Sequence, residues 1–230
     1  MTEIRRALAR DTAQRHLESG DPVGWFEELY AQAKGDSCAI PWADLTPNAN
    51  LVAWLDAHAV SGDGKAALVV GCGLGDDAEE LQRRGFDTTA FDVSPTAINW
   101  CRKRFPQSHV RYIAADLFQA PPEWERGFDF VLESYTLQVL PPNLRRETMT
   151  RIAGFVAPGG VLLVIARGRE PSDPEGNMPW PLTRHELNHF KECGLEEVSF
   201  DDYLDQEMPP VRRFRVTYQK KANVSRADGT

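Results

Sequence analysis

The chain has 230 residues, 42% of them hydrophobic, which is enough for the core of one α/β domain with an added segment. Its formal net charge of −8 argues against broad nucleic-acid binding, which needs clustered lysines and arginines. No apolar run approaches the ~20 residues that span a bilayer, and the N-terminus lacks the apolar core of a signal peptide. We therefore expect a cytoplasmic protein that binds neither nucleic acid nor membrane.

Residues 1–64 are expected to be an N-terminal helical cap. Residues 1–20 predict a first helix, and Asp21 followed by Pro22 predicts the capped start of a second. The second and third helices carry apolar residues at helical spacing, namely Trp25, Phe26, Leu29 and Tyr30, then Leu51, Trp54 and Leu55.

From residue 65 the pattern alternates between strands and helices. The expected strands are 66–71, 87–92, 109–113, 128–133 and 161–166, and the expected helices are 76–84, 95–104, 143–156 and 184–193. Two last strands, near 195–203 and 210–219, have no helix between them. The alternation predicts a mostly parallel sheet, and the last pair predicts an antiparallel hairpin at its edge. This domain should cover residues 65–221, with a disordered polar tail at 222–230.

A glycine turn follows the first expected strand. Gly71, Gly73 and Gly75 stand at alternate positions directly before a helix, and glycines let a backbone approach a ligand closely. The next strand ends in Asp92, about 17 residues after Gly75, where a carboxylate can accept hydrogen bonds from a ribose diol. The unit predicts a nucleoside-binding site.

A nicotinamide dinucleotide is the alternative ligand for this turn. Dinucleotide enzymes prefer the pattern G-x-G-x-x-G, whereas this chain has G-x-G-x-G followed by Asp76 and Asp77. Carboxylates at a helix N-terminus repel a pyrophosphate and suit a ligand that carries an ammonium group.

Five features in this order resemble the class I S-adenosylmethionine-dependent methyltransferases. They are the glycine turn, Asp92, Asp116-Leu117 after the third strand, Pro158-Gly159-Gly160 before the fifth strand, and the final hairpin. The resemblance covers about residues 65–220 and implies an α/β, Rossmann-like sheet of seven strands, with S-adenosyl-L-methionine as cofactor and S-adenosyl-L-homocysteine as product. It further implies cofactor contacts: Gly71, Gly73 and Gly75 to the methionine part, Asp92 to the ribose, and Val93, Asp116 and Leu117 to the adenine.

The N-terminal section looks like the entry segment of the thiol, thiopurine and halide methyltransferase group. That group has spaced aromatics on a helix and a Pro-Trp-Asp element over the cofactor, which implies that Trp25 and Trp42 cover it here. The element is one residue longer in this chain, Pro41-Trp42-Ala43-Asp44, so Asp44 departs from the pattern. Aromatics at helical spacing are equally typical of a core, and that alternative stays open for Trp25 and Tyr30.

Three residues are candidates for the acceptor side of the site. Glu133, Tyr135 and Arg167 follow the fourth and fifth strands, and ligands of parallel sheets bind at the carboxyl ends of strands. The resemblance implies that Glu133 also contacts the cofactor, near the transferring methyl. There it could act as a base, and Arg167 could favour a thiolate. The long loop 168–181 is a candidate lid, with Met178 and Trp180 as an apolar wall.

These observations predict methyl transfer to a small molecule, a thiol or other soft nucleophile, by a monomer or homodimer. An oxygen or nitrogen acceptor is the alternative within the fold, and a non-catalytic binding scaffold is the alternative of another class. One motif competes with this prediction: His185-Glu186-Leu187-Asn188-His189 matches the zinc pattern H-E-x-x-H. Thr183 and Glu186 also form a capping box, and no third ligand follows at a short distance, so we expect no metal site.

Overall fold

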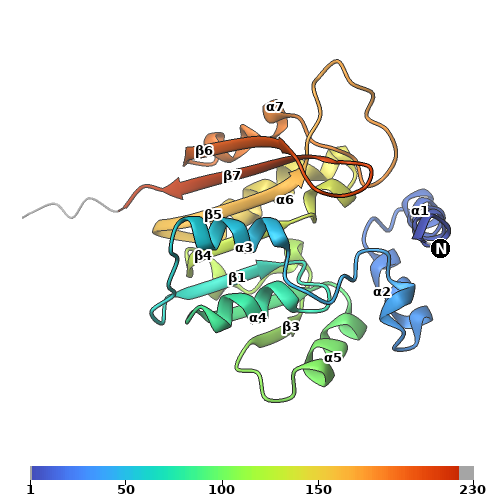
Figure 1. Cartoon of the computed structure of the whole chain (residues 1–230), viewed down its shortest axis with the longest axis horizontal. Coiled ribbons are helices and arrows are strands. Elements are labelled where there is room, and N and C mark those ends of the chain that lie inside the picture. The colour runs from blue at the N-terminus through green and yellow to red at the C-terminus, as the bar shows by residue number, and fades with distance from the viewer. Residues whose placement is uncertain (1, 223–230) are drawn as a thin grey trace, which may run out of the picture.

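The computed structural model describes residues 2–222, so the predicted disorder of the tail falls, except for residue 222, outside the described residues. A seven-stranded sheet runs through the centre of the fold in the order β3-β2-β1-β4-β5-β7-β6 (Figure 1). The strands are β1 (Ala66–Val70), β2 (Asp87–Asp92), β3 (Arg111–Ala114), β4 (Phe128–Ser134), β5 (Val156–Arg167), β6 (Leu195–Leu204) and β7 (Arg212–Lys220).

Pairing in the sheet is parallel from β3 to β5, and β7 runs antiparallel between β5 and β6. The predicted seven-stranded sheet with an antiparallel C-terminal hairpin is therefore confirmed. The strand order reverses between β1 and β4, and ligands of open α/β sheets bind in the crevice at such a point.

Helices cover both faces of the sheet. They are α1 (Thr2–Glu18), α2 (Gly24–Ala33), α3 (Ala49–Ala57), α4 (Asp76–Arg83), α5 (Pro95–Arg104), α6 (Pro142–Phe155), α7 (Arg184–Leu187) and α8 (His189–Glu192), with short 3₁₀ turns η1 (Ser37–Ala39), η2 (Leu117–Gln119), η3 (Pro122–Trp124) and η4 (Leu137–Val139). Within the described residues, no helix has both the length and the apolar character to cross a bilayer.

The first three helices take two different places. Leu51 and Leu55 of α3 are fully buried against the sheet, and the Trp54 indole donates to Thr217 Oγ1 of β7 at 3.0 Å. By contrast, α1 and α2 lie beyond the ends of the strands, at the end of the sheet toward which β1 and β5 run (Figure 1). The carboxyl ends of the parallel strands are therefore next to α1 and α2.

Two predicted elements differ in detail. The expected helix 184–193 is interrupted at Asn188 and forms two short helices. At the break, the Leu187 carbonyl accepts from the Tyr218 hydroxyl at 3.0 Å, and the Lys191 N–H donates to the Asn188 carbonyl, three residues back. The second helix begins at Gly24 rather than at Pro22, although the Asp21 carboxylate still accepts from the Gly24 N–H at 2.8 Å.

Candidate active site

The glycine turn connects β1 to α4 and needs glycine for two reasons. Gly71, Gly73 and Gly75 have φ of 61°, 54° and 90°, in the left-handed region that other residues rarely adopt. A Cβ on Gly71 would lie 2.5 Å from Thr136 Oγ1, and one on Gly75 would lie 2.6 Å from the Tyr112 hydroxyl. Side chains from β3 and from the loop after β4 therefore pack directly onto this backbone.

Asp92 lies at the carboxyl end of β2, and its side chain is only 7% exposed. The Gly73 N–H donates to one carboxylate oxygen and the Ser94 N–H to the other, each at 2.9 Å. Each oxygen keeps a free lone pair that a hydroxyl can use. Burial raises the pKa of Asp92 to about 6, so hydroxyl donors would stabilise the ionised form. The residues fit a ribose diol beside the glycine turn.

Asp116 and Leu117 stand next to this loop, since the Ala115 N–H donates to the Asp92 carbonyl at 3.0 Å. The Asp116 carboxylate accepts from the Phe118 N–H at 2.9 Å and caps the 3₁₀ turn η2. Leu117 is buried in the main core, and Val93 is half-buried. The structure thus explains Asp116 as a cap, and its contact with adenine stays a prediction.

Side chains of α2 form hydrogen bonds with the loop after Asp92 and with the segment before α3. The Glu27 carboxylate accepts from Ser94 Oγ and from Thr96 Oγ1, both at 2.6 Å, directly after Asp92. The Tyr30 hydroxyl accepts from the Trp42 indole at 2.9 Å and lies near Gly73, whose added Cβ would be 3.3 Å away.

The two tryptophans predicted to cover the cofactor differ in exposure. Trp25 is 1% exposed and packs among Ala9, Leu29 and Met178, so it belongs to the interior. In this structure Trp25 therefore has the core role that the sequence left open as an alternative to cofactor contact. Trp42 is 38% exposed and stays a candidate for cofactor contact.

The acidic pair after the turn is only partly available to an ammonium group. Asp76 forms a bidentate ion pair with Arg104, with N–O distances of 2.8 and 2.7 Å, which corrects the expectation that both charges face the ligand. Asp77 accepts from the Asn48 N–H at 2.7 Å, and burial raises its pKa to about 6. Asp77 is therefore the acidic residue of this pair without a cationic partner among the described residues.

Glu133 ends up fully buried at the end of β4. One carboxylate oxygen accepts from the Thr136 N–H at 2.8 Å and the Leu137 N–H at 2.9 Å, which shapes the turn before η4. The other oxygen has no hydrogen-bond partner among the described residues, and burial raises the pKa to about 7. Glu133 therefore positions the β4 loop, and its role as a base stays a prediction.

Tyr135 directly follows β4 in an unusual backbone conformation. Its φ is 65°, and such strain in a bulky residue is typical of functional sites. The hydroxyl accepts from the Asn50 side-chain amide N–H at 3.1 Å, and Asn50 Oδ1 accepts from the Tyr203 hydroxyl at 2.7 Å. Asn48 adds a bond to Ser134 Oγ at 2.9 Å. The sequence offered only one signal for these partners, namely that Asn48 caps α3.

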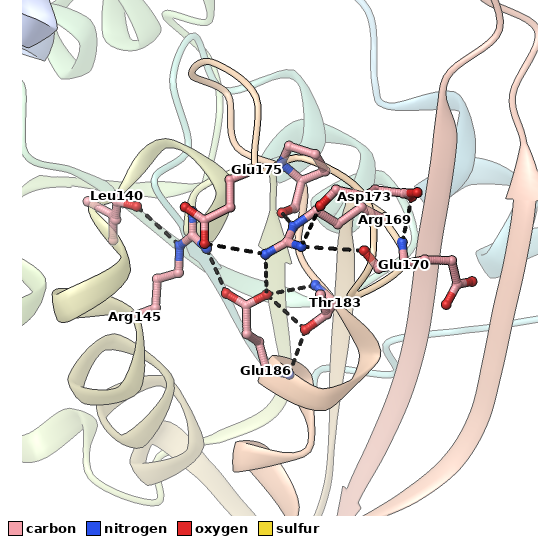
Figure 2. Close-up of polar contacts among 9 residues, drawn as sticks. Leu140, Arg145, Arg169, Glu170, Asp173, Glu175, Thr183 and Glu186 are labelled. Atoms are coloured by element: carbon pink, nitrogen blue, oxygen red, sulfur yellow. Dashed lines mark hydrogen bonds and ion pairs between the residues drawn. The ribbon is translucent and has the colours of Figure 1, made fainter.

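The loop 168–181 is held at both ends. Figure 2 shows the Arg169 guanidinium among loop carbonyls and beside Glu186, which also accepts from Arg145 at 2.7 Å. Further along, Met178 is buried against α1 and α2. The Trp180 N–H donates to the Gln138 carbonyl at 2.7 Å. The loop therefore joins the N-terminal helices to the β4 loop, and its opening as a lid stays a prediction.

The H-E-x-x-H segment makes contacts that do not converge. Glu186 bonds to Arg145 and closes the predicted capping box with Thr183, while His189 bonds to Thr150 Oγ1 at 2.9 Å. His185 and His189 also lie on separate helices. In the part of the chain that the structure describes, no three histidine, cysteine or acidic side chains gather as a metal site.

A cavity of about 530 Å³ lies elsewhere, between the base of the loop 168–181 and the last two strands. Its arginines are largely paired: Arg212 with Glu170 and Asp202, and Arg184 with Glu197. The cavity does not include the glycine turn or Asp92.

Comparisons with known proteins give matches to methyltransferases. Residues 67–160 match a family model described as a methyltransferase domain. An uncharacterized methyltransferase of Mycobacterium tuberculosis is 33% identical over 125 residues, which is 54% of this chain and 60% of that protein. A probable thiol methyltransferase of Arabidopsis thaliana is 24% identical over 161 residues, covering 68% of this chain and 67% of that one. The chain thus spans about 60% of the length of the first relative.

Two solved structures share the fold. One, described as the conversion of a disulfide bond into a thioacetal group during echinomycin biosynthesis, has a TM-score of 0.69 and 24% identity over 88% of this chain and 94% of that one. The other is a Burkholderia thailandensis 1,6-didemethyltoxoflavin-N1-methyltransferase with bound S-adenosylhomocysteine, with a TM-score of 0.67 and 19% identity over 85% and 87%. The chain is thus similar to methyltransferases over residues 67–160, and it shares its fold with the two solved structures; none of these matches singles out the thiol and halide group.

Proposed function

We propose that this chain transfers the methyl group of S-adenosylmethionine to a small molecule. The observation that carries the proposal is the buried Asp92 carboxylate, held by the Gly73 N–H where the strand order reverses. Bound there, the cofactor would supply a methyl group activated on a sulfonium. Gly71, Gly73 and Gly75 would approach its methionine part, Asp92 would accept from the ribose hydroxyls, and Asp116 would face the adenine.

We further propose a thiol or other soft nucleophile as the acceptor. The similarity to the Arabidopsis thiol methyltransferase and to the structure from echinomycin biosynthesis supports a sulfur acceptor. The acceptor sulfur would form a bond to the methyl carbon while the bond from that carbon to the sulfonium breaks, which yields a thioether and S-adenosylhomocysteine. The thiol proton would leave to Glu133 or to solvent. A nitrogen or oxygen acceptor is the second candidate, since the Burkholderia neighbour is an N-methyltransferase.

The chain's own residues would contribute mainly by placement. A thiol of ordinary pKa is only ~3% ionised at pH 7, so a cation near the sulfur would increase the reactive fraction. Arg167 and Tyr135, at the ends of β5 and β4, are the proposed lining of the acceptor site. Alignment of the two reactants can supply an effective molarity of ~10⁵ M or more.

Calorimetric titration with S-adenosylmethionine and S-adenosylhomocysteine tests the proposal. Asp92→Ala should weaken binding at least ~100-fold, because it removes two charge-assisted hydrogen bonds to the ribose. Asp87→Ala is the matched control, since Asp87 starts the same strand at its far end and is exposed. Absence of binding by the unaltered chain would favour the scaffold alternative.

A screen of thiols, amines and hydroxylated metabolites with methyl-labelled cofactor identifies the acceptor class. Labelled thioethers would support the sulfur acceptor, and label only on nitrogen or oxygen would refute it. Glu133→Gln should lower turnover if Glu133 takes the proton, and full activity of that variant would exclude this role.

A further inference from the structure

Two arginines face each other at the carboxyl end of the sheet, close to Tyr135. Arg167 is the last residue of β5, and it pairs directly opposite Arg213 of β7 in the antiparallel register. Directly opposite residues of an antiparallel pair project to the same face of a sheet. The Arg213 guanidinium lies 4.7 Å from the centre of the Tyr135 ring. Both cations therefore lie on the Tyr135 side of the proposed acceptor site.

Only one of these arginines is neutralised. Arg213 is 2% exposed and forms ion pairs with Asp205, at 2.6 Å, and with Glu207. Arg167 has no ion-pair partner among the described residues, and its buried Nε–H has no hydrogen-bond acceptor there. Burial, together with the nearby charges of Arg213 and Arg6, lowers the pKa of Arg167. A buried donor without an acceptor is costly, by about 1–3 kcal/mol or more when charged.

We propose that Arg167 binds a carboxylate carried by the methyl acceptor. This inference rests on the proposed function and names its substrate class. A guanidinium offers Nε–H and an Nη–H side by side, at the spacing of the two oxygens of a carboxylate, so such a ligand satisfies the orphaned Nε donor.

The surrounding charges favour a single negative charge on the ligand. Arg167, Arg213 and Arg6 contribute three positive charges, while Asp205 and Glu207 contribute two negative ones, which leaves one positive charge to balance. A carboxylate brings the net charge of these groups to zero, whereas a phosphate dianion would make it negative. The Tyr135 hydroxyl accepts from the Asn50 amide at 3.1 Å, and its own hydrogen could be donated to the acceptor molecule.

The test is equilibrium binding of two matched thiols to the full chain saturated with S-adenosylhomocysteine. The probes are 3-mercaptopropionate and its amide, 3-mercaptopropionamide, which differ in the carboxylate. The unaltered chain should prefer the acid, and Arg167→Gln should reduce that preference, measured as the ratio of the two affinities within each protein, by about 10- to 100-fold. Arg167→Lys should retain part of this preference, because lysine keeps the positive charge but lacks the two parallel N–H donors of the guanidinium.

Arg151→Gln is the control, since Arg151 is an exposed arginine of α6. Equal binding of acid and amide, no binding of the acid at millimolar concentration, or an unchanged preference in Arg167→Gln would overturn the inference. If the proposed function is wrong, the chain will not bind S-adenosylhomocysteine, which is a separate result. In that case the two thiols are titrated into the chain without the nucleoside. An acid preference that depends on Arg167 would still support the site.

Discussion

Replacing Glu133 with glutamine should remove a pH dependence from the stability of this chain. The Glu133 side chain is fully buried, one of its oxygens has no hydrogen-bond partner among the described residues, and burial raises its pKa from 4.5 to about 7. The folded state therefore holds a proton on this group that the unfolded state releases at lower pH. Stability should fall as pH rises from about 4.5 to about 7 and stay level above that, because the folded protein must then bury the ionised form.

The size of this effect follows from the two pKa values. For a group that titrates at 4.5 when unfolded and about 7 when folded, linkage gives a loss of roughly 2.5 kcal/mol between pH 5 and pH 8. Glutamine keeps a carbonyl that can accept from the Thr136 and Leu137 N–H groups, and it does not ionise. The variant should therefore not lose this free energy of unfolding as pH rises. Any change in stability that the amide itself causes is the same at every pH.

Urea unfolding of both proteins at several pH values between 5 and 8 measures the difference. Other buried carboxylates also titrate in this range, so the informative quantity is the stability of Glu133→Gln relative to the unaltered chain at each pH. That relative stability should rise by about 2.5 kcal/mol from pH 5 to pH 8. Glu123→Gln, at an exposed position in η3, should show no such trend. A pH-independent difference for Glu133→Gln would refute the reasoning.

Three further substitutions test how the site is held together. Gly75→Ala should lower the free energy of unfolding by about 2–3 kcal/mol and weaken cofactor binding, because φ is 90° and the new Cβ meets the Tyr112 hydroxyl; unchanged urea unfolding would contradict this. Gln138→Ala should cost about 1–3 kcal/mol, since it leaves the Arg167 N–H unpaired, and proteolysis of the loop 168–181 should become faster than in the unaltered chain. Glu27→Gln should loosen α2 from the loop after Asp92, measured as faster amide hydrogen exchange in α2; equal exchange rates would show that other contacts hold the helix.

Local patterns in the sequence were sufficient for the central sheet and for the juxtaposition of the glycine turn with Asp92. The alternation of strands and helices is a property of neighbouring residues, so it predicted the seven strands within a few positions, apart from β5, which extends back to Val156 and includes the predicted turn. Asp92 meets the glycine turn because both follow adjacent parallel strands, and the carboxyl ends of such strands share one edge. The sequence did not show that the charge of Asp76 is neutralised, because its ion-pair partner Arg104 lies on a different helix, α5.

The acceptor half depends on pairings between distant parts of the chain. The sequence by itself named Arg167 and Tyr135, but it could not place Arg213 opposite Arg167, because that contact depends on the register of β7 against β5. Nor could it bring Asn50 to the Tyr135 hydroxyl, since α3 reaches β4 only by packing on the sheet. Local periodicity thus determined the sheet and the glycine turn of the proposed cofactor site, whereas tertiary packing decided that Arg213 near the proposed acceptor site is paired with acidic side chains and that Arg167 is not.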